Sequence, residues 1–318
     1  MATPNLGFNT VIGLALEATP GTPEARTVWL PVVSASLQRV LGKDPVATLA
    51  YDGAVNRTRH HWHSDQGQGQ IVVEPCFEGF GLLWKWWLGA AATGAASGGI
   101  YPHTYTQART LPSATAELVL GDSGNSQVFA GAHCSKGELV LEIGKRALFS
   151  ADMLAYEPAA PGSAGTPTFT ASLDLPMSAI EAGDLSWNSR TLSSDNIQKV
   201  TISLDNKIAA RPRFGSRKSS RPTRTAASEV LITVECDYHT DNFETDWVSN
   251  STADLTLTLT GTGSRTLVIT GSDAYISSHS RPLSGEGVVR CTLQFRCKGG
   301  TDALKLVANN TQSDATAA

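Results

Sequence analysis

A strand pattern that occurs twice limits what this chain can fold into. Ile71-Val72-Val73-Glu74 recurs as Ile232-Thr233-Val234-Glu235, 161 positions later (232 − 71 = 161). The same spacing aligns Phe77 with Tyr238 and Trp86 with Trp247. A period of this length is too long for a solenoid or a propeller blade. The repeat therefore predicts two related halves, each with an apolar strand followed by a short segment that contains Trp.

The flanking sequences extend the repeat and suggest domain boundaries. A loop rich in Gly, Ser and Arg precedes each copy, over 52–69 and 211–228, and residues 144–149 have a counterpart at 285–290, where the spacing has shrunk to 141 (285 − 144 = 141). We expect two tandem, similar domains: residues 1–157 with an N-terminal arm, and residues 168–308. Residues 158–167, rich in Pro, Gly, Ser and Ala, form the expected linker. Residues 309–318 are expected to be flexible or ordered only by a neighbour.

Alternation of apolar and polar residues predicts an all-β protein. It is clearest in three segments, 200–205, 255–260 and 289–296, and further candidate strands are 115–120, 138–143, 147–156, 168–173 and 267–270. Many short strands separated by Gly, Pro and Asn are typical of a sandwich or barrel. Apolar spacing of three and four residues predicts one short helix per half, within 79–88 and 242–248. The expected fold is two β-sandwiches with long hairpin loops.

Composition and charge exclude several classes of function. The net charge of −4 over 318 residues argues against a chain whose main task is to hold nucleic acid. The longest apolar run, 81–92, is broken by Lys85 and is too short to cross a bilayer, so no membrane insertion is expected. We find no signal peptide and expect a protein made in a cytoplasm. The five cysteines have no CxxC spacing and are expected to be reduced and mostly buried.

Motifs of enzymes and metal sites are missing from the sequence. His60, His61 and His63 with Asp65 stand in a Gly/Gln-rich loop without a second cluster of ligands, which favours an exposed loop over a metal site. No phosphate-binding loop and no G-x-S-x-G elbow is present. The sequence therefore predicts no catalytic, metal or cofactor residues, and a protein that is not an enzyme.

Two features point to assembly through surfaces. Six cations fall within fourteen residues of the second loop: Arg211, Arg213, Arg217, Lys218, Arg221 and Arg224. With only Phe214 available for stacking, a protein partner is favoured over DNA, and a mobile solvated loop is the alternative. The strand that follows has one apolar face and one face that carries Glu235 and Asp237, and the first copy has Glu74 at the equivalent place.

The N-terminal region resembles a known family. Gly13-Leu14-Ala15-Leu16-Glu17-Ala18-Thr19-Pro20-Gly21-Thr22-Pro23, followed by Trp29-Leu30-Pro31-Val32, is similar to the N-terminal signature of tail tube proteins of long, non-contractile-tailed bacteriophages. The segments Gly69–Pro75 and Gly81–Leu83 resemble the region that follows it. The resemblance implies a structural subunit of the virion tail, assembled in the host cytoplasm. Its inner sheet would join those of neighbouring subunits in a ring, and rings would stack into a hollow tube that conducts DNA during ejection.

The duplication suggests how that architecture applies here. Three double chains can replace six copies of a single tube domain, so a homotrimeric, pseudo-hexameric ring is favoured, with a hexamer as the alternative. Residues expected to face the lumen are Glu74, Asp205, Glu235 and Asp237, and the DNA would pass without specific binding. Residues expected to contact the adjacent ring are Arg57 and Arg59 in the first loop and the six cations of the second. The family further implies tape measure, tail terminator and tail-tip proteins as partners.

Two other functions stay open from the sequence. One is a two-domain β-sandwich binding module of a tail tip that recognises a carbohydrate or a receptor, for which Trp62 and the cluster Trp84, Trp86 and Trp87 are the candidate aromatics. The other, less favoured, is a nucleic-acid-binding protein that acts through the loop 211–224. Tubes or stacked rings of the purified chain would exclude both.

Overall fold

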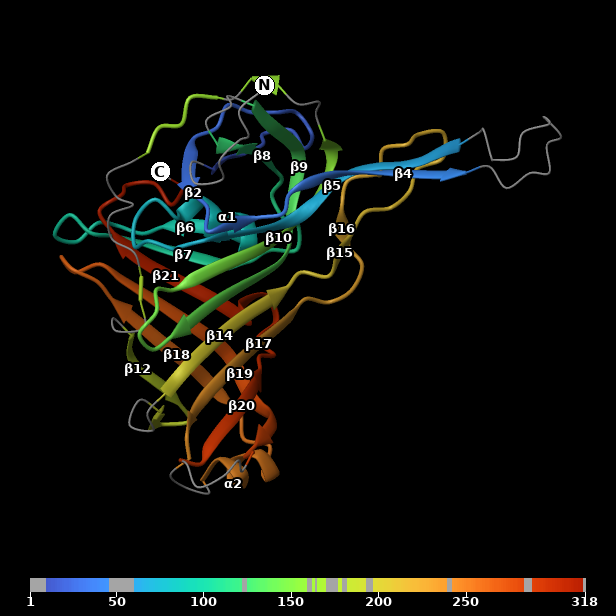
Figure 1. Cartoon of the computed structure of the whole chain (residues 1–318). Helices are drawn as coiled ribbons and strands as arrows, with labels where there is room; N and C mark the ends of the chain where they lie inside the picture. Colours follow the sequence, from blue (N-terminus) through green and yellow to red (C-terminus); the bar gives the residue numbers. More distant parts are fainter. Residues whose placement is uncertain are drawn as a thin grey trace.

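The computed structural model describes residues 10–45, 60–121, 125–158, 162–163, 165–169, 177–178, 182–192, 197–238, 242–282 and 288–316. The all-β class is confirmed, because antiparallel strands dominate these residues and two short α-helices accompany them. Figure 1 shows an elongated body from which a long two-stranded arm projects near one end, and α2 lies at the opposite end of the body.

One continuous sheet runs through the molecule. From one open edge to the other, its strands follow the order β4 (Gln38–Pro45), β5 (His60–Val73), β10 (Leu148–Pro158), β9 (Asn125–Glu142), β14 (Ile197–Asp205), β17 (Glu229–Asp237), β20 (Arg290–Arg296) and β19 (Thr266–Ser280). The short strand β3 (Ser34–Ala35) extends β4 along the same edge of β5. All pairings are antiparallel.

The same order of strands occurs twice along this sheet. In the first half β4–β5–β10–β9 lie side by side, and in the second half β14–β17–β20–β19 repeat the arrangement. The repeat continues into the second layer, where the N-terminal part of β9 pairs with β8 (Ala114–Val119) and that of β19 with β18 (Ala253–Thr260). Next come the hairpin β1 (Val11–Leu16) and β2 (Val28–Pro31) in the first half, and β12 (Ala182–Trp187) and β13 (Arg190–Thr191) in the second.

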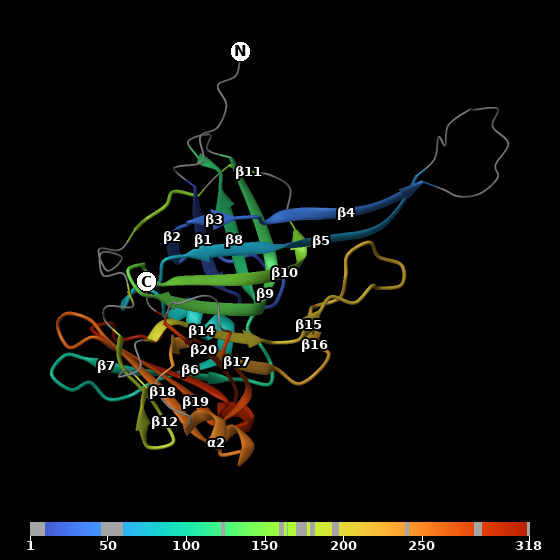
Figure 2. The same ribbon diagram turned by 60° about the horizontal axis from the view of Figure 1, so that its bottom comes forward.

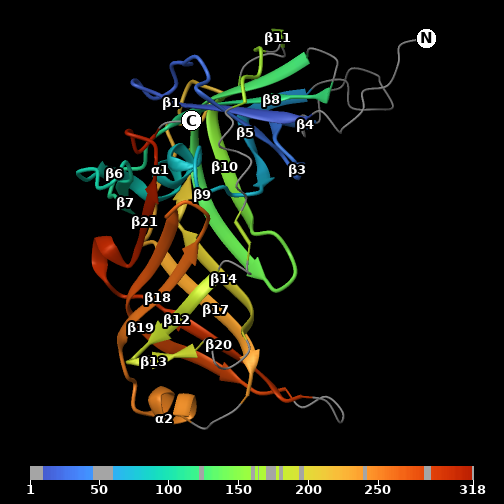
Figure 3. The same cartoon turned by 90° about the vertical axis from the view of Figure 1, so that its left-hand side faces the viewer.

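The two halves are not resolved as separate sandwich domains. The backbone ladder between β9 and β14 joins their sheets, and one cluster of buried apolar residues extends from Ile12 to Ala315. A further join is made by β6 (Gly89–Thr93), β7 (Tyr101–Gln107) and β21 (Leu304–Asn310), because β21 pairs with β7 of the first half and β19 of the second. Figure 3 shows these strands between the upper and lower parts of the body.

The strand register corrects one detail of the sequence repeat. Val73 lies opposite Phe149, and its counterpart Val234 lies opposite Leu293. Leu293 is therefore the structural counterpart of Phe149, and the predicted alignment of residues 144–149 with 285–290 was wrong by three positions. The physical reason is burial: both Phe149 and Leu293 are fully buried, whereas Arg290 is exposed.

The two helices occupy the predicted places but differ in burial. The first, α1 (Gly81–Leu88), is buried at every residue except Lys85, and Trp84 and Trp87 both pack against Phe149 with ring centroids 5.2 Å apart. The second, α2 (Asn242–Val248), buries Phe243 but leaves Trp247 partly exposed.

The N-terminal signature has a structural explanation. The Glu17 carboxylate accepts hydrogen bonds from the Gly21 N–H at 2.8 Å, the Gly131 N–H at 2.7 Å and the Thr115 hydroxyl at 2.9 Å. Gly21 has φ +86°, and a Cβ there would lie 2.4 Å from the Tyr156 hydroxyl. Glu17 therefore ties the loop after β1 to β8 and β9, which explains the Glu and the Gly of this motif.

The expected flexible tail, residues 309–318, and the expected linker, residues 158–167, differ in part from what their composition predicts. The C-terminal segment packs within the chain, since the Tyr105 hydroxyl donates to the Ala315 carbonyl at 2.8 Å and the Gly79 N–H to the Gln312 side chain at 3.0 Å. In the linker region, β10 continues to Pro158, and β11 (Gly162–Ser163) pairs with β9. The described part of the expected strand 168–173 has no regular structure.

Candidate assembly surfaces

The long sheet has one buried face and one polar face. Ile71, Val73, Ile232 and Val234 are fully buried, as their alternation predicted. Thr233 lies on the opposite face, and its cross-strand neighbours Thr201 and Gln294 are also polar. Glu235 shares this face and keeps 44% of its side-chain surface exposed. The result is a broad polar surface across β5, β10, β9, β14, β17 and β20.

The acidic residues of this polar face each have a basic neighbour. Glu74 pairs with Arg146 at 2.7 Å, and Asp205 with Lys207 at 2.6 Å. The more distant pair Glu235 and Lys199 is separated by 3.8 Å.

The fourth predicted residue follows the same pattern, because Asp237 lies directly across the ladder from Arg290. Arg296 on the same strand is 3.1 Å from Glu229. The polar face is therefore mixed in charge rather than acidic, and its charges interact with one another instead of forming one strong field.

A pair of hairpins projects from the body on one side. One is the β4–β5 arm; the other is the segment between β15 (Ile208–Ala209) and β16 (Thr223–Arg224), and Figure 2 shows both on the same side. They are joined to each other, because the Asp65 N–H donates to the Arg217 carbonyl at 2.9 Å. Within the arm, the Asp65 carboxylate pairs with Arg39 at 2.6 Å. The two predicted contact loops thus meet inside one chain. Arg57 and Arg59 lie outside the described residues.

The tip of the second hairpin is exposed. A tight turn places Ser216 opposite Arg213, with Gly215 at φ +76°. The residues at this end, Arg211, Arg213, Phe214, Arg217 and Lys218, are exposed, and Phe214 is more exposed (110%) than in an extended reference peptide. Lys218 also forms an ion pair with Glu157. An exposed aromatic ring among cations is a surface suited to a protein contact.

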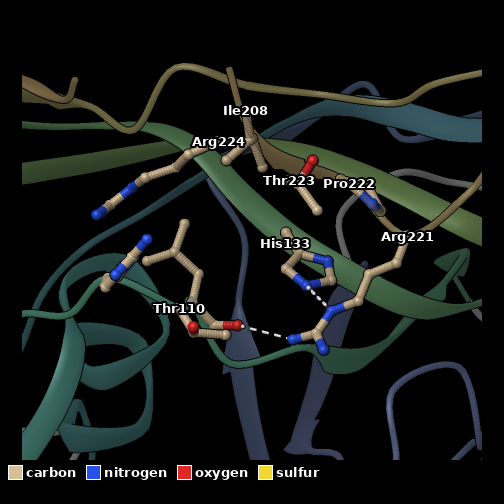
Figure 4. A pocket seen from close by; sticks show the side chains of 9 residues that line it. Thr110, His133, Ile208, Arg221, Pro222, Thr223 and Arg224 are labelled. Carbon is tan, nitrogen blue, oxygen red and sulfur yellow. Dashed lines mark hydrogen bonds between the residues drawn. The ribbon is translucent and has the colours of Figure 1, made fainter. Parts of the chain in front are cut away.

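The base of the same hairpin is held by the chain itself. Arg224 donates to the Ala108 carbonyl and to the Asn206 side chain, both at 2.7 Å. Arg221 donates to His133 Nε2 at 3.3 Å and to the Leu111 carbonyl at 3.2 Å. Figure 4 shows these side chains around a cavity of about 440 Å³ between the hairpin and β9.

His133 at this base is neutral at ordinary pH. Its Nδ1 donates to the Gly131 carbonyl at 2.9 Å, so Nε2 accepts from Arg221. Burial, assisted by the charge of Arg221, lowers the pKa of His133 to about 4, although the hydrogen bond to the Gly131 carbonyl opposes the shift. Sequence reasoning missed this site because nothing in the spacing of His133 and Arg221 indicates that they meet.

The predicted six cations therefore divide into two groups. Arg221 and Arg224 anchor the hairpin, whereas Arg211 and Arg213 are at its exposed end. Arg224 is half-buried, and this desolvation lowers its pKa.

Two other classes of site concern metal ions and membranes. The side chains of His60, His61 and His63 lie outside the described part, and within that part no group of three or more His, Cys, Asp or Glu residues could hold a metal ion. No described helix has the length and apolar character that crossing a membrane requires.

Comparison with known proteins gives one result that covers most of the chain. Residues 7–297 match the family described as phage tail tube protein. A search of curated proteins found no match.

Proposed function

The chain belongs to the phage tail tube protein family and is a non-enzymatic structural component of a phage tail, and we propose that three copies form each ring of its tube. The observation that carries this proposal is the repeated strand order β4–β5–β10–β9 and β14–β17–β20–β19 within one sheet. A duplicated tube domain would supply two ring positions from each chain. Three chains would then make a pseudo-sixfold ring.

Ring closure would also solve a physical problem of this sheet. Among the described residues, the outer edges of β4 and of the C-terminal part of β19 have no strand partner, and such edges favour pairing with another chain. A head-to-tail contact that closes on itself satisfies every edge, whereas an isologous dimer would leave the outer edges unpaired. We propose that the tube belongs to the tail of a siphophage.

The polar face of the sheet is proposed to line the bore. Its mixed charges would give a hydrated surface without a strong positive field, so that DNA passes without specific binding. Glu74, Asp205, Glu235 and Asp237 are the proposed acidic residues of this lining. The two joined hairpins are proposed to contact the adjacent ring through Arg211, Arg213 and Phe214. At its ends the tube would meet tape measure, terminator and tip proteins.

Labelling of a cysteine in assembled tubes tests the bore assignment. Thr233→Cys places a thiol in the middle of the polar face, between Thr201 and Gln294. In tubes seen by negative-stain microscopy, a small maleimide should label it, whereas a maleimide on a large polyethylene glycol should label the soluble subunit but not the tube wall. Full labelling of long tubes by the large reagent would place this face outside the bore. A purified chain that forms no tube or ring would contradict the assembly itself.

A further inference from the structure

We infer that neighbouring copies in a ring join by a contact that repeats, residue for residue, the β9–β14 pairing inside one chain. The C-terminal part of β19 in one copy would pair antiparallel with β3 and β4 of the next copy. This inference rests on the proposed function and adds the partner surface and its register. It requires only that the two halves are equivalent. This equivalence can be tested by comparing the strand registers of the two halves position by position.

The first edge can be matched with β14. Ala35 lies opposite Ile71, and Ile202 lies opposite the counterpart Ile232. Farther along, Gln38 lies opposite Gln68, and Asp205 lies opposite the counterpart Glu229. Both comparisons give the same alignment, in which β3 and the start of β4 correspond to β14. Ser34 is then equivalent to Thr201, and Ser36 to Ser203.

The second edge can be matched with β9. Phe149 lies opposite Leu139, and its counterpart Leu293 lies opposite His279. The next pairs agree, since Ser278 lies opposite Gln294 where Glu138 lies opposite Ser150. Ser278 is therefore equivalent to Glu138.

One position farther on the same strands, Ser280 lies opposite Thr292 where Val140 lies opposite Leu148. Ser280 is therefore equivalent to Val140, and the C-terminal part of β19 corresponds to that of β9.

Transfer of the internal register then fixes the contact between copies. Inside the chain Thr201 lies opposite Val140, and Ser203 opposite Glu138. The equivalent pairs between copies are Ser34 with Ser280, and Ser36 with Ser278. All four serines are exposed in the single chain.

Exposure of apolar residues at both edges supports this contact. Val33 is 55% exposed, whereas its equivalent Val200 is 4% exposed because β9 covers it. On the helices, Trp247 is 43% exposed against 0% for Trp86, and Val248 is 77% exposed against 0% for Trp87. Apolar residues that are covered on α1 and β14 are therefore exposed at the equivalent positions on α2 and next to β3.

The cover over α1 shows what α2 lacks. Trp87 Nε1 donates to the Leu204 carbonyl at 3.5 Å, and the Asn206 side chain donates to the Trp87 carbonyl at 2.9 Å. Leu204 lies near the end of β14 and Asn206 directly follows this strand, so the second half covers α1 of the first half. The equivalent cover for α2 would be the backbone around Leu37 of the next copy, which in this interpretation buries Val248. Figure 3 shows α2 at the end of the body away from β4.

The hydrogen-bond pattern selects sites for a covalent test. The β9–β14 ladder continues through Ile143 N–H to Gln198 carbonyl at 3.0 Å and Asn206 N–H to Ser135 carbonyl at 2.8 Å. These bonds mark the hydrogen-bonded pairs, so Thr201 and Val140 form a non-hydrogen-bonded pair, with Cα atoms about 4.5 Å apart. This spacing lies within the range of disulfides, about 4.4–6.8 Å. Cysteines at the equivalent serines should therefore link neighbouring copies.

Four double-cysteine variants measure the register. The matched pairs are Ser34→Cys with Ser280→Cys and Ser36→Cys with Ser278→Cys, and mild oxidation of assembled protein should link most chains into closed rings on a non-reducing gel. The shifted pairs, Ser36→Cys with Ser280→Cys and Ser34→Cys with Ser278→Cys, lie on a diagonal about 7–8 Å apart and should link several-fold less. Four of the native cysteines are buried, and Cys236 and Cys291 face each other within the chain, so they give little background between chains.

A second variant tests the helix contact without a cross-link. Val248→Arg leaves the single chain folded, because Val248 is exposed there, but should prevent ring formation by placing a charge in the contact. Val288→Arg is the matched control, since Val288 is a similarly exposed valine outside both edges. Rings of normal yield from Val248→Arg would overturn the helix part of the contact.

The outcomes separate this inference from the proposed function. Tubes that form normally but cross-link better through the shifted pairs, or through none of the four, would overturn the register while leaving the tube function intact. Failure of the wild-type chain to form rings or tubes under any assembly condition would count against the proposed function. Preferential linkage of both matched pairs supports the two together.

Discussion

Single side chains in the Arg-rich segment have different tasks although their composition looks uniform. Arg221 and Arg224 donate to carbonyls of Leu111 and Ala108, and Arg224 also satisfies the buried side chain of Asn206. Arg211 and Arg213 are exposed near the turn. Sequence alone could not separate them, because the distinction depends on which carbonyls the fold brings within reach.

Double substitutions should separate the two groups. Arg221→Ser with Arg224→Ser should lower the free energy of unfolding by about 2–4 kcal/mol, since charged hydrogen bonds are lost and the Asn206 oxygen is left unsatisfied. Arg211→Ser with Arg213→Ser should leave stability within about 0.5 kcal/mol of wild type but slow tube growth. Denaturant unfolding and light scattering measure the two effects. Equal stability of both variants would contradict the anchoring role.

The protonation of His133 should make stability depend on pH. Its pKa is lowered to about 4 in the folded chain, below the usual 6.5, so the unfolded chain binds more protons between these values. Stability is therefore complete above pH 6.5 and is lost as the pH falls towards 4, by up to about 3 kcal/mol. Unfolding between pH 4 and 7 should show this loss, and His133→Asn should remove that part of the slope. An unchanged slope in the variant would contradict it.

At the scale of elements, sequence pattern predicted the strands with strict alternation and both helices. It missed most of β5, because His60–Gly69 contains Gly and Gln instead of alternating apolar residues, and this strand is held by β4 rather than by a core. It also missed the C-terminal strand β21, which completes a sheet between the halves. Such pairings depend on partners distant in the sequence, so local pattern carries little information about them.

The ion pair between Arg39 and Asp65 should stiffen the β4–β5 arm. Asp65→Ala removes this ion pair but keeps the backbone N–H that donates to the Arg217 carbonyl, and the residues of the buried core are unaffected. We expect faster amide hydrogen exchange in residues 38–44, exchange close to wild type in residues 211–218, and a change in melting temperature of only a few degrees. Glu157→Gln, which removes the neighbouring ion pair with Lys218 but keeps Asp65, is the matched control. Exchange in residues 38–44 that matches the wild type would show that this ion pair does not hold the arm.

At the scale of the whole molecule, the N-terminal signature and the segments that follow it predicted the family, whose match covers residues 7–297. They did not predict that one sheet would join both halves, because the β9–β14 pairing has no signal in either strand alone. That joined sheet is the physical basis of the proposed trimer, because the pairing made once within a chain is the pairing that we propose is made three times between chains.

The most direct test of this account is the number of chains in one ring. Native mass measurement of isolated rings, or symmetry analysis of tube cross-sections by cryo-electron microscopy, gives that number without mutation. We predict three copies of the 33.6 kDa chain per ring. The six similar densities around the bore should alternate between two kinds, one for each half of the chain. Six full-length chains in each ring would contradict the assignment of two ring positions to every chain.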